Sequence, residues 1–130
     1  MIERYWNADW LATIIGVIFL AVGLFGFVQN PVVSESGFFQ VNDAHNWVHI
    51  ATGVIFLAGV LFRIPVLTLR ALAVIYALIA IIGLAIPDRM LFGVIEMNAA
   101  DRWLHLAVAA VLLLVGFLTP ARENIRTAHF

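Results

Sequence analysis

Four long apolar segments, separated by short polar ones, dominate the pattern of hydrophobic and polar positions along the chain. The apolar segments cover residues 10–28, 47–62, about 66–86 and 103–119. Their lengths are close to the roughly 20 residues with which an α-helix crosses the hydrocarbon of a bilayer. Prolines lie in the polar breaks, and proline ends a helix because it lacks a backbone donor and clashes with the preceding turn. The pattern therefore predicts an all-α protein, a four-helix transmembrane bundle.

The composition places the chain outside the soluble globular class. Of its 130 residues, 64% are hydrophobic and only 12% are charged, with a mean hydropathy of +1.04. Soluble domains are typically about half apolar and a quarter charged, so this chain needs the lipid bilayer to cover its apolar surface. A chain of this length holds about four spans of roughly 20 residues each with their connections, which predicts one transmembrane domain over residues 1–130.

Charge and cysteine content exclude several functional classes. Seven basic and eight acidic residues give a net charge of -1, whereas a nucleic-acid-binding protein is normally basic, so no nucleic-acid partner is expected. The chain has no cysteine. This excludes disulfides, iron–sulfur clusters, thiolate zinc sites, thiol nucleophiles and covalently attached c-type haem.

The distribution of arginines predicts the orientation in the membrane. Cytoplasmic loops and termini of membrane proteins carry an excess of basic residues. The termini and the middle loop region hold five arginines, namely Arg4, Arg63, Arg70, Arg122 and Arg126. The other two loops hold Arg89 and Arg102. We therefore expect a multi-pass protein of the inner (cytoplasmic) membrane with both termini in the cytoplasm. The tryptophans would then flank both interfaces, at Trp6, Trp10, Trp47 and Trp103.

The two halves of the chain match each other at a constant offset of 56 residues. Seven identical pairs are Pro31/Pro87, Gly37/Gly93, Asn42/Asn98, Ala44/Ala100, Trp47/Trp103, His49/His105 and Ala51/Ala107. Each half contains two spans, so both halves share one membrane orientation. This predicts two parallel two-helix repeats, about 10–63 and 66–119, related by a pseudo-twofold axis along the membrane normal.

The repeat brings four potential metal ligands to the outer ends of the second and fourth helices. His45 and His49 are four residues apart, as are Asp101 and His105, so each pair shares one helix face. The small residues Gly53 and Ala109, one turn further along, would let these two helices approach closely. Thirteen residues separate His49 from Phe62, or roughly 20 Å of helix against a hydrocarbon of about 30 Å. The imidazoles are thus expected inside the outer leaflet, where ionisable groups are costly and often functional.

A purely structural interpretation explains many of the same residues. Asn42 and Asn98 are good N-caps, and Asp43 and Asp101 suit the first turn of a helix. The histidines could then bond each other, a loop carbonyl, Gln40 or Glu96. Gln40 and Glu96 could equally orient metal-ligating imidazoles. Among weaker features, Tyr76 could bond Thr13 or Thr52, and His129 lies in a polar tail.

Two cofactor hypotheses follow from the constellation. Three imidazoles and a carboxylate, His45, His49, Asp101 and His105, would suit zinc, iron, nickel or copper. Alternatively, His49 and His105 alone could be axial ligands of a b-type haem or of chlorophyll. The close helix approach expected from Gly53 and Ala109 leaves little space for a macrocycle.

The leading functional hypothesis is a non-enzymatic membrane protein that binds a metal ion at these four residues. The alternative is an accessory subunit, in a homo-oligomer or a larger membrane complex, whose small-residue faces dock on a partner. Such faces are Gly16 and Gly23 in the first helix and Ala73, Ala77 and Ala80 in the third. A membrane enzyme that uses Asp101 as a general base is a further possibility.

At these residues the chain resembles a bacterial family of small four-helix membrane proteins known only as a domain of unknown function. The resemblance rests on Phe39-Gln40-Val41, on His45-Asn46-Trp47-Val48-His49, and on the segment from Asn98 to His105, which reads Asn-Ala-Ala-Asp-Arg-Trp-Leu-His. It covers most of the chain and implies a four-helix membrane fold with a polar site, but no activity. Arg102 stands where the family is expected to have Asn, and beside Asp101 it could neutralise that carboxylate.

Overall fold

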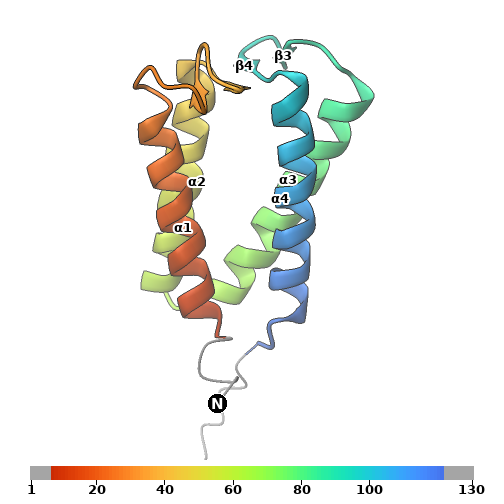
Figure 1. Cartoon of the computed structure of the whole chain (residues 1–130). Helices are drawn as coiled ribbons and strands as arrows, with labels where there is room; N and C mark the ends of the chain where they lie inside the picture. Colours follow the sequence, from red (N-terminus) through yellow and green to blue (C-terminus); the bar gives the residue numbers. More distant parts are fainter. Residues whose placement is uncertain (1–6, 122–130) are drawn as a thin grey trace, which may run out of the picture.

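The computed structural model describes residues 7–121 and contains the four helices that the sequence predicts (Figure 1). The helices are α1 (Ala8–Phe25), α2 (Asp43–Leu61), α3 (Pro65–Ala85) and α4 (Ala99–Leu118). All four are long and apolar enough to cross a membrane. The orientation signals predicted at Arg4, Trp6, Arg122 and Arg126, and the polar tail with His129, lie outside the described residues.

Side-chain caps determine where three of the helices begin. The amide oxygens of Asn7, Asn42 and Asn98 each accept a hydrogen bond from the backbone N–H three residues later. These bonds satisfy donors that a helix leaves free at its first turn. Helix α3 instead begins with Pro65 at its first position, where the missing donor has no consequence. The predicted caps Asn42 and Asn98 are therefore confirmed.

Helix α1 ends three residues before the end of its apolar segment. The sequence predicts a helix to residue 28, but α1 ends at Phe25. The N–H groups of Phe27 and Val28 bond to carbonyls three residues back, so the chain tightens beyond Gly26. Hydrophobicity alone does not signal this change, because the tightened turn is as apolar as the helix before it.

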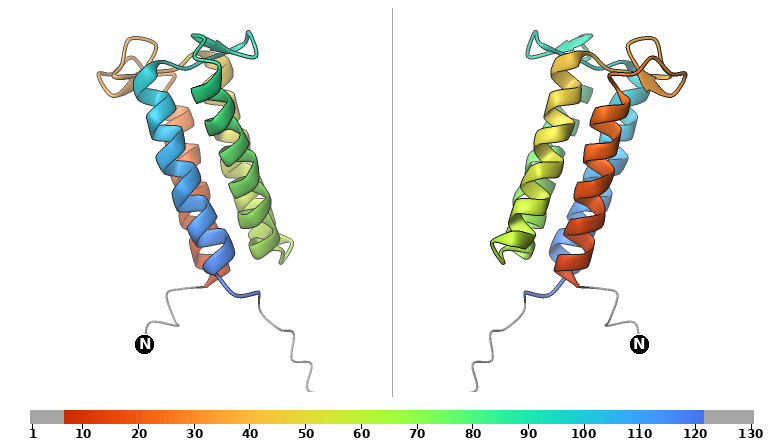
Figure 2. Two further views of the ribbon diagram at one scale, coloured as in Figure 1. Left: turned by 90° about the vertical axis from the view of Figure 1, so that its right-hand side faces the viewer. Right: turned by 90° about the vertical axis from the view of Figure 1, so that its left-hand side faces the viewer.

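The helices pack as two pairs, α1 with α2 and α3 with α4, and the pairs lie side by side (Figures 1 and 2). Glycine permits the close approach within the first pair. A Cβ atom on Gly53 would lie 2.7 Å from the carbonyl oxygen of Gly16 and 2.8 Å from the backbone nitrogen of Leu20. The prediction that Gly53 lets α2 approach α4 is therefore wrong, since this glycine faces α1.

The core lies between the two pairs and is made of aliphatic and aromatic side chains. Phe56 from α2, Leu69 and Ala73 from α3 and Leu112 from α4 are all 2% exposed or less. Large apolar side chains such as Val17 point outward instead. Apolar side chains therefore lie both in the core and on the outer surface of the bundle, an arrangement consistent with contact with lipid.

Short strands, which the hydrophobic pattern did not predict, cross one end of the bundle (Figure 1). Between α1 and α2, β1 (Val33–Ser34) pairs with β2 (Phe39–Gln40), and between α3 and α4, β3 (Met90–Leu91) pairs with β4 (Ile95–Glu96). We call this end, which carries the strands, the outer end. Helix α1 begins and α4 ends at the opposite, inner end.

Corresponding helices and strands of the two halves begin at nearly the same distance from one another along the sequence. Helix α3 and strand β3 begin 57 residues after α1 and β1, whereas β4 and α4 begin 56 residues after β2 and α2. The connection between the strands is one residue shorter in the second half, 92–94 against 35–38. The bounds of the helices and strands therefore follow the offset of 56 only from the second strand of each half onward.

Candidate metal centre

Three of the four predicted ligands come together at the outer end of the bundle. His45 and His49 lie on the first two turns of α2, and His105 lies on the second turn of α4. The centroids of their rings are 4.5, 5.4 and 6.0 Å apart. One ring nitrogen from each histidine lies within 4.8 Å of the other two, and the residues are 1%, 6% and 6% exposed.

This spacing is close to that of a bound metal site. Ligand atoms placed about 2.0–2.1 Å from a tetrahedral ion stand roughly 3.3 Å apart. The three nitrogens therefore need to approach by about 1.5 Å at most, which is within the reach of small side-chain rotations. The residues present fit a metal ion by their chemistry and by their convergence.

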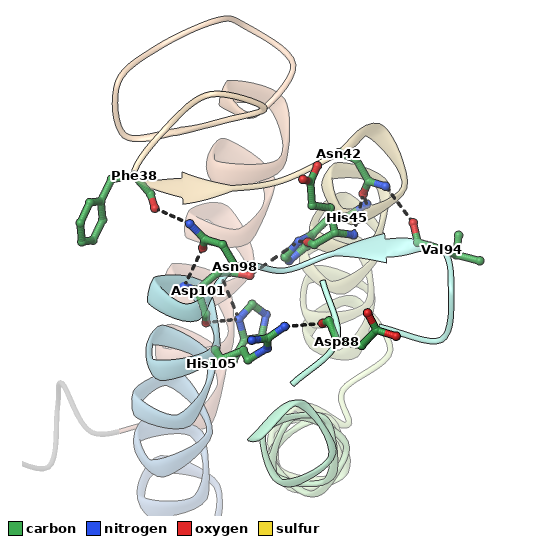
Figure 3. A network of polar contacts seen from close by, with 10 residues as sticks. Phe38, Asn42, His45, Asp88, Val94, Asn98, Asp101 and His105 are labelled. Carbon is green, nitrogen blue, oxygen red and sulfur yellow. Dashed lines mark hydrogen bonds and ion pairs between the residues drawn. The ribbon is translucent and has the colours of Figure 1, made fainter. Parts of the chain in front are cut away.

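Asp101 lies beside the three histidines but is not part of the group of converging nitrogens. Its carboxylate is buried, with Oδ1 3.4 Å from Nδ1 of His105 and Oδ2 3.7 Å from Nδ1 of His45. Oδ2 has no hydrogen-bond partner. Arg102 does not neutralise it, as the sequence suggested, because its guanidinium donates to the backbone carbonyl of Asp88 (Figure 3).

Backbone carbonyls fix which nitrogen of two histidines is available. Nδ1 of His45 lies 2.6 Å from the carbonyl oxygen of Glu96, and Nδ1 of His105 lies 2.8 Å from that of Asp101. A carbonyl can only accept, so in each ring Nδ1 carries the hydrogen. In the neutral imidazole Nε2 then has a free lone pair, which is the form that a metal needs. Nδ1 of His49 has no partner.

Aromatic side chains close the inner side of the cluster. The ring of Tyr76 is parallel to that of His105 with centroids 6.0 Å apart, and Phe19 meets His49 edge-on at 5.8 Å. Of the two partners considered for Tyr76, the structure selects Thr52, at 2.9 Å between the hydroxyl oxygens. Thr52 donates to the carbonyl of Val48, so Tyr76 donates to Thr52.

Glu96 takes part in the site through its backbone rather than its side chain. Its carbonyl accepts from His45, while its carboxylate forms an ion pair with Arg89 at 2.8 Å. Gln40, the corresponding candidate of the first half, has no described contact to a histidine. The sequence pattern also suggested no role for Asn46, which is 1% exposed and lies against Gly26. Its position between two histidines of the motif was the available signal.

The structure contains both the helix caps of the structural interpretation and the converging histidines of the metal-site hypothesis. Asn42 and Asn98 cap their helices, yet the imidazoles still gather one to two turns further in. Asp43 is exposed at the first turn of α2. Trp47 and Trp103 are 61% and 63% exposed at the same level of the bundle, as expected of side chains that face a membrane interface.

Together, the fold and the site define a class: small four-helix proteins with helices of membrane-spanning length and a buried histidine cluster at one end. Residues 9–118 match the family model DUF4383, a domain of unknown function, and the chain belongs to this family. The match confirms the resemblance to a family of unknown function. Comparisons with curated proteins and with solved structures gave no match.

Proposed function

We propose that this chain is an integral membrane protein that binds one divalent transition-metal ion at the outer ends of α2 and α4. The observation that carries the proposal is the convergence of three buried imidazoles within 4.8 Å. Buried polar groups are normally hydrogen-bonded, and two of the atoms here that lack a partner belong to the predicted ligands, Nδ1 of His49 and Oδ2 of Asp101. A cation bound by His49 would satisfy the first of these atoms, and its positive charge would compensate the buried carboxylate of Asp101 nearby.

The donor set favours particular ions and roles. Imidazole nitrogens without sulfur suit zinc, iron, nickel or copper. We assign the ligands to His45, His49 and His105, with Nε2 as the ligand atom of the first and the last. Asp101 contacts the Nδ1 side of two rings, so it orients them and contributes negative charge close to the ion. The ion supplies positive charge and, if its fourth position stays free, a Lewis-acid centre.

Membrane integration and orientation form part of the same proposal. Four helices of spanning length with apolar outer faces support insertion in a bilayer. The excess of arginines at the termini and the middle loop supports both termini in the cytoplasm of an inner membrane. The histidine cluster then lies in the outer leaflet.

The geometry gives less support to a tetrapyrrole between His49 and His105. A haem would have to occupy the space between these two rings, but the ring of His45 lies 4.5 and 5.4 Å from them. Tyr76 and Phe19 cover the remaining sides. A single ion needs no such space.

The accessory-subunit alternative also loses its main argument. It relied on faces of small residues free to dock on a partner. In the structure Gly16 packs on Gly53 and Phe56, and Ala73 and Ala80 are buried in the core. These faces are therefore used within the bundle. A pocket of about 300 Å³ near Asn42 is lined by no histidine and is therefore separate from the cluster.

The test is elemental analysis of protein purified in detergent without any chelator. We expect close to one equivalent of a transition metal per chain, lost in a variant that combines His49→Ala with His105→Ala. Thr68→Val is the matched control, because it removes a buried hydroxyl at the inner end of the bundle. Wild-type protein that contains no stoichiometric metal, and takes up none from zinc, nickel, copper or ferrous salts, would refute the proposal.

A further inference from the structure

We infer that strand β4 of the second half positions His45 of the first half, and that Asn42 is the residue that holds this strand in place. The inference rests on the proposed metal site and adds a means of controlling it. His45 is then a ligand whose availability depends on the outer strand, whereas Nδ1 of His105 is bonded to a carbonyl of its own helix and His49 has no bond to a strand.

The contacts converge on Glu96. Its carbonyl oxygen accepts from Nδ1 of His45 at 2.6 Å, and its N–H donates to the side-chain oxygen of Asn42 at 3.2 Å. Its carboxylate is bound twice by the guanidinium of Arg89, at 2.8 and 3.0 Å. Glu96 is therefore fixed through its side chain, its donor and its acceptor. The imidazole of His45 takes its orientation from a carbonyl that cannot move freely.

Asn42 joins the two halves while it caps its own helix (Figure 3). Its oxygen accepts from the N–H groups of His45 and Glu96, and its amide nitrogen donates to the carbonyl of Val94 at 2.8 Å. The side-chain amide of Asn42 thus bonds to the hairpin of β3 and β4 both as a donor and as an acceptor. A single side chain links the first turn of α2 to both ends of β4.

A reciprocal contact on the other side provides a comparison within the same molecule. The amide nitrogen of Asn98 donates to the carbonyl of Phe38 at 2.9 Å, and its oxygen caps α4 at Asp101 (Figure 3). The residue three positions after this cap is Asp101, whereas the residue three positions after Asn42 is His45. Asn98 therefore joins the two halves as Asn42 does, but no histidine ring is bonded to the segment at Phe38 that Asn98 contacts.

This difference predicts an asymmetric effect on the ligands. If the contact at Asn42 loosens, the hydrogen-bond partner that sets the tautomer and rotation of His45 is displaced. Of the two rings that a carbonyl orients, only His105 then keeps its partner. Loss of the same contact at Asn98 leaves both His45 and His105 with their carbonyl partners.

The experiment compares Asn42→Asp with Asn98→Asp. Aspartate caps a helix as well as asparagine does, so each variant keeps its cap. In place of the N–H donor it puts a negatively charged oxygen against the carbonyl of Val94 or Phe38, which pushes the opposite loop away. Loss of a group that orients a metal-ligating histidine typically weakens metal binding about 10–100-fold, and we expect this for Asn42→Asp. For Asn98→Asp we expect a change below about threefold. The Co²⁺ absorption spectrum should change only in Asn42→Asp.

Two further measurements separate positioning from general damage and from failure of the metal site itself. In a His45→Ala background, Asn42→Asp should have no additional effect on Co²⁺ affinity, because it acts through that ring. In metal-free protein, the ¹⁵N shifts of His45 should show Nδ1 protonated in wild type and a mixture of tautomers in Asn42→Asp. The inference is overturned if both asparagine variants weaken Co²⁺ binding equally or if the tautomer of His45 is unchanged. If the wild-type protein binds no metal, but the tautomer of His45 still differs between wild type and Asn42→Asp, only the proposed metal site is refuted.

Discussion

Replacing Asp101 by asparagine distinguishes a carboxylate that orients ligands from one that binds the ion. The substitution keeps the volume of the side chain and removes its negative charge. Asp101 lies 3.4 and 3.7 Å from Nδ1 of His105 and His45, and it is not part of the converging nitrogens. We therefore expect Asp101→Asn to retain metal with reduced affinity.

The magnitude depends on how firmly the two rings stay oriented without the carboxylate. Asp101 serves two of the three ligands, but each of these rings keeps a backbone carbonyl at 2.6 or 2.8 Å. Removing an orienting carboxylate typically costs about 10–100-fold in affinity, which corresponds to about 1.4–2.7 kcal/mol. His105→Ala removes a ligand and should reduce affinity further.

The assay is a competition titration of Co²⁺ and Zn²⁺ in detergent, read by the Co²⁺ absorption spectrum. Asp101→Asn should keep the spectral pattern of wild type and shift the titration midpoint. Asp43→Asn is the matched control, because Asp43 is also an acidic residue in the first turn of a helix but is exposed. It should change the affinity less than about threefold, since solvent screens an exposed charge.

Two outcomes would contradict this reasoning. An affinity unchanged by Asp101→Asn would mean that the buried carboxylate does not act on the rings. A loss as large as that of His105→Ala, with a changed Co²⁺ spectrum, would show that Asp101 is itself a ligand.

The other predictions concern stability. Gly53→Ala should lower the free energy of unfolding by about 1–3 kcal/mol, because its Cβ would meet backbone atoms of α1 at 2.7–2.8 Å. Gly83→Ala should raise it by up to about 1 kcal/mol, because the nearest atom to its Cβ lies at 3.4 Å and alanine favours a helix. Both values can be measured by reversible unfolding in mixed detergent micelles, and equal effects would refute the packing argument. Arg70→Ala should cost about 1 kcal/mol in the same assay, since Arg70 donates to the carbonyl of Gly116 at 3.0 Å near the end of α4; an unchanged midpoint would show that this bond does not stabilise the fold. Treatment of metal-loaded protein with a chelator should lower its melting temperature, and Zn²⁺ at about 100 times its Kd should restore about 2.7 kcal/mol. A melting temperature that does not respond to either would count against a metal bound to the folded state.

Most of the fold could be predicted from the sequence because it is determined by local patterns. Apolar length predicts the four helices, and asparagines at 42 and 98 predict where two of them begin. The partners of the small residues were harder, because a glycine shows that something approaches closely but not which helix it is. Gly53 was assigned to the wrong neighbour for this reason.

The histidines of the site could also be predicted, whereas the groups that orient them could not. Spacing of four residues places His45 and His49 on one face, and the match between the halves brings in His105. The carbonyl of Glu96 has no sequence signature, since every residue has one. Arg102, in contrast, has a clear sequence signal that pointed to the wrong partner. Its charge suggested Asp101, but its long side chain donates to the carbonyl of Asp88 in a loop.

The short connection between the two helix pairs lies far from the histidine cluster, so a rotation about this connection produces a large displacement at the cluster. Residues 62–64 join α2 to α3 at the inner end, and His45 lies 17 residues before Phe62, or about 25 Å along the helix. A rotation of one pair against the other by about 3° about this connection would displace His45 by roughly 1.3 Å. That displacement is comparable to the distance over which the ligand nitrogens must close on an ion. A small change of angle at the inner end of the bundle would therefore move His45 by about as much as the proposed metal site needs in order to close.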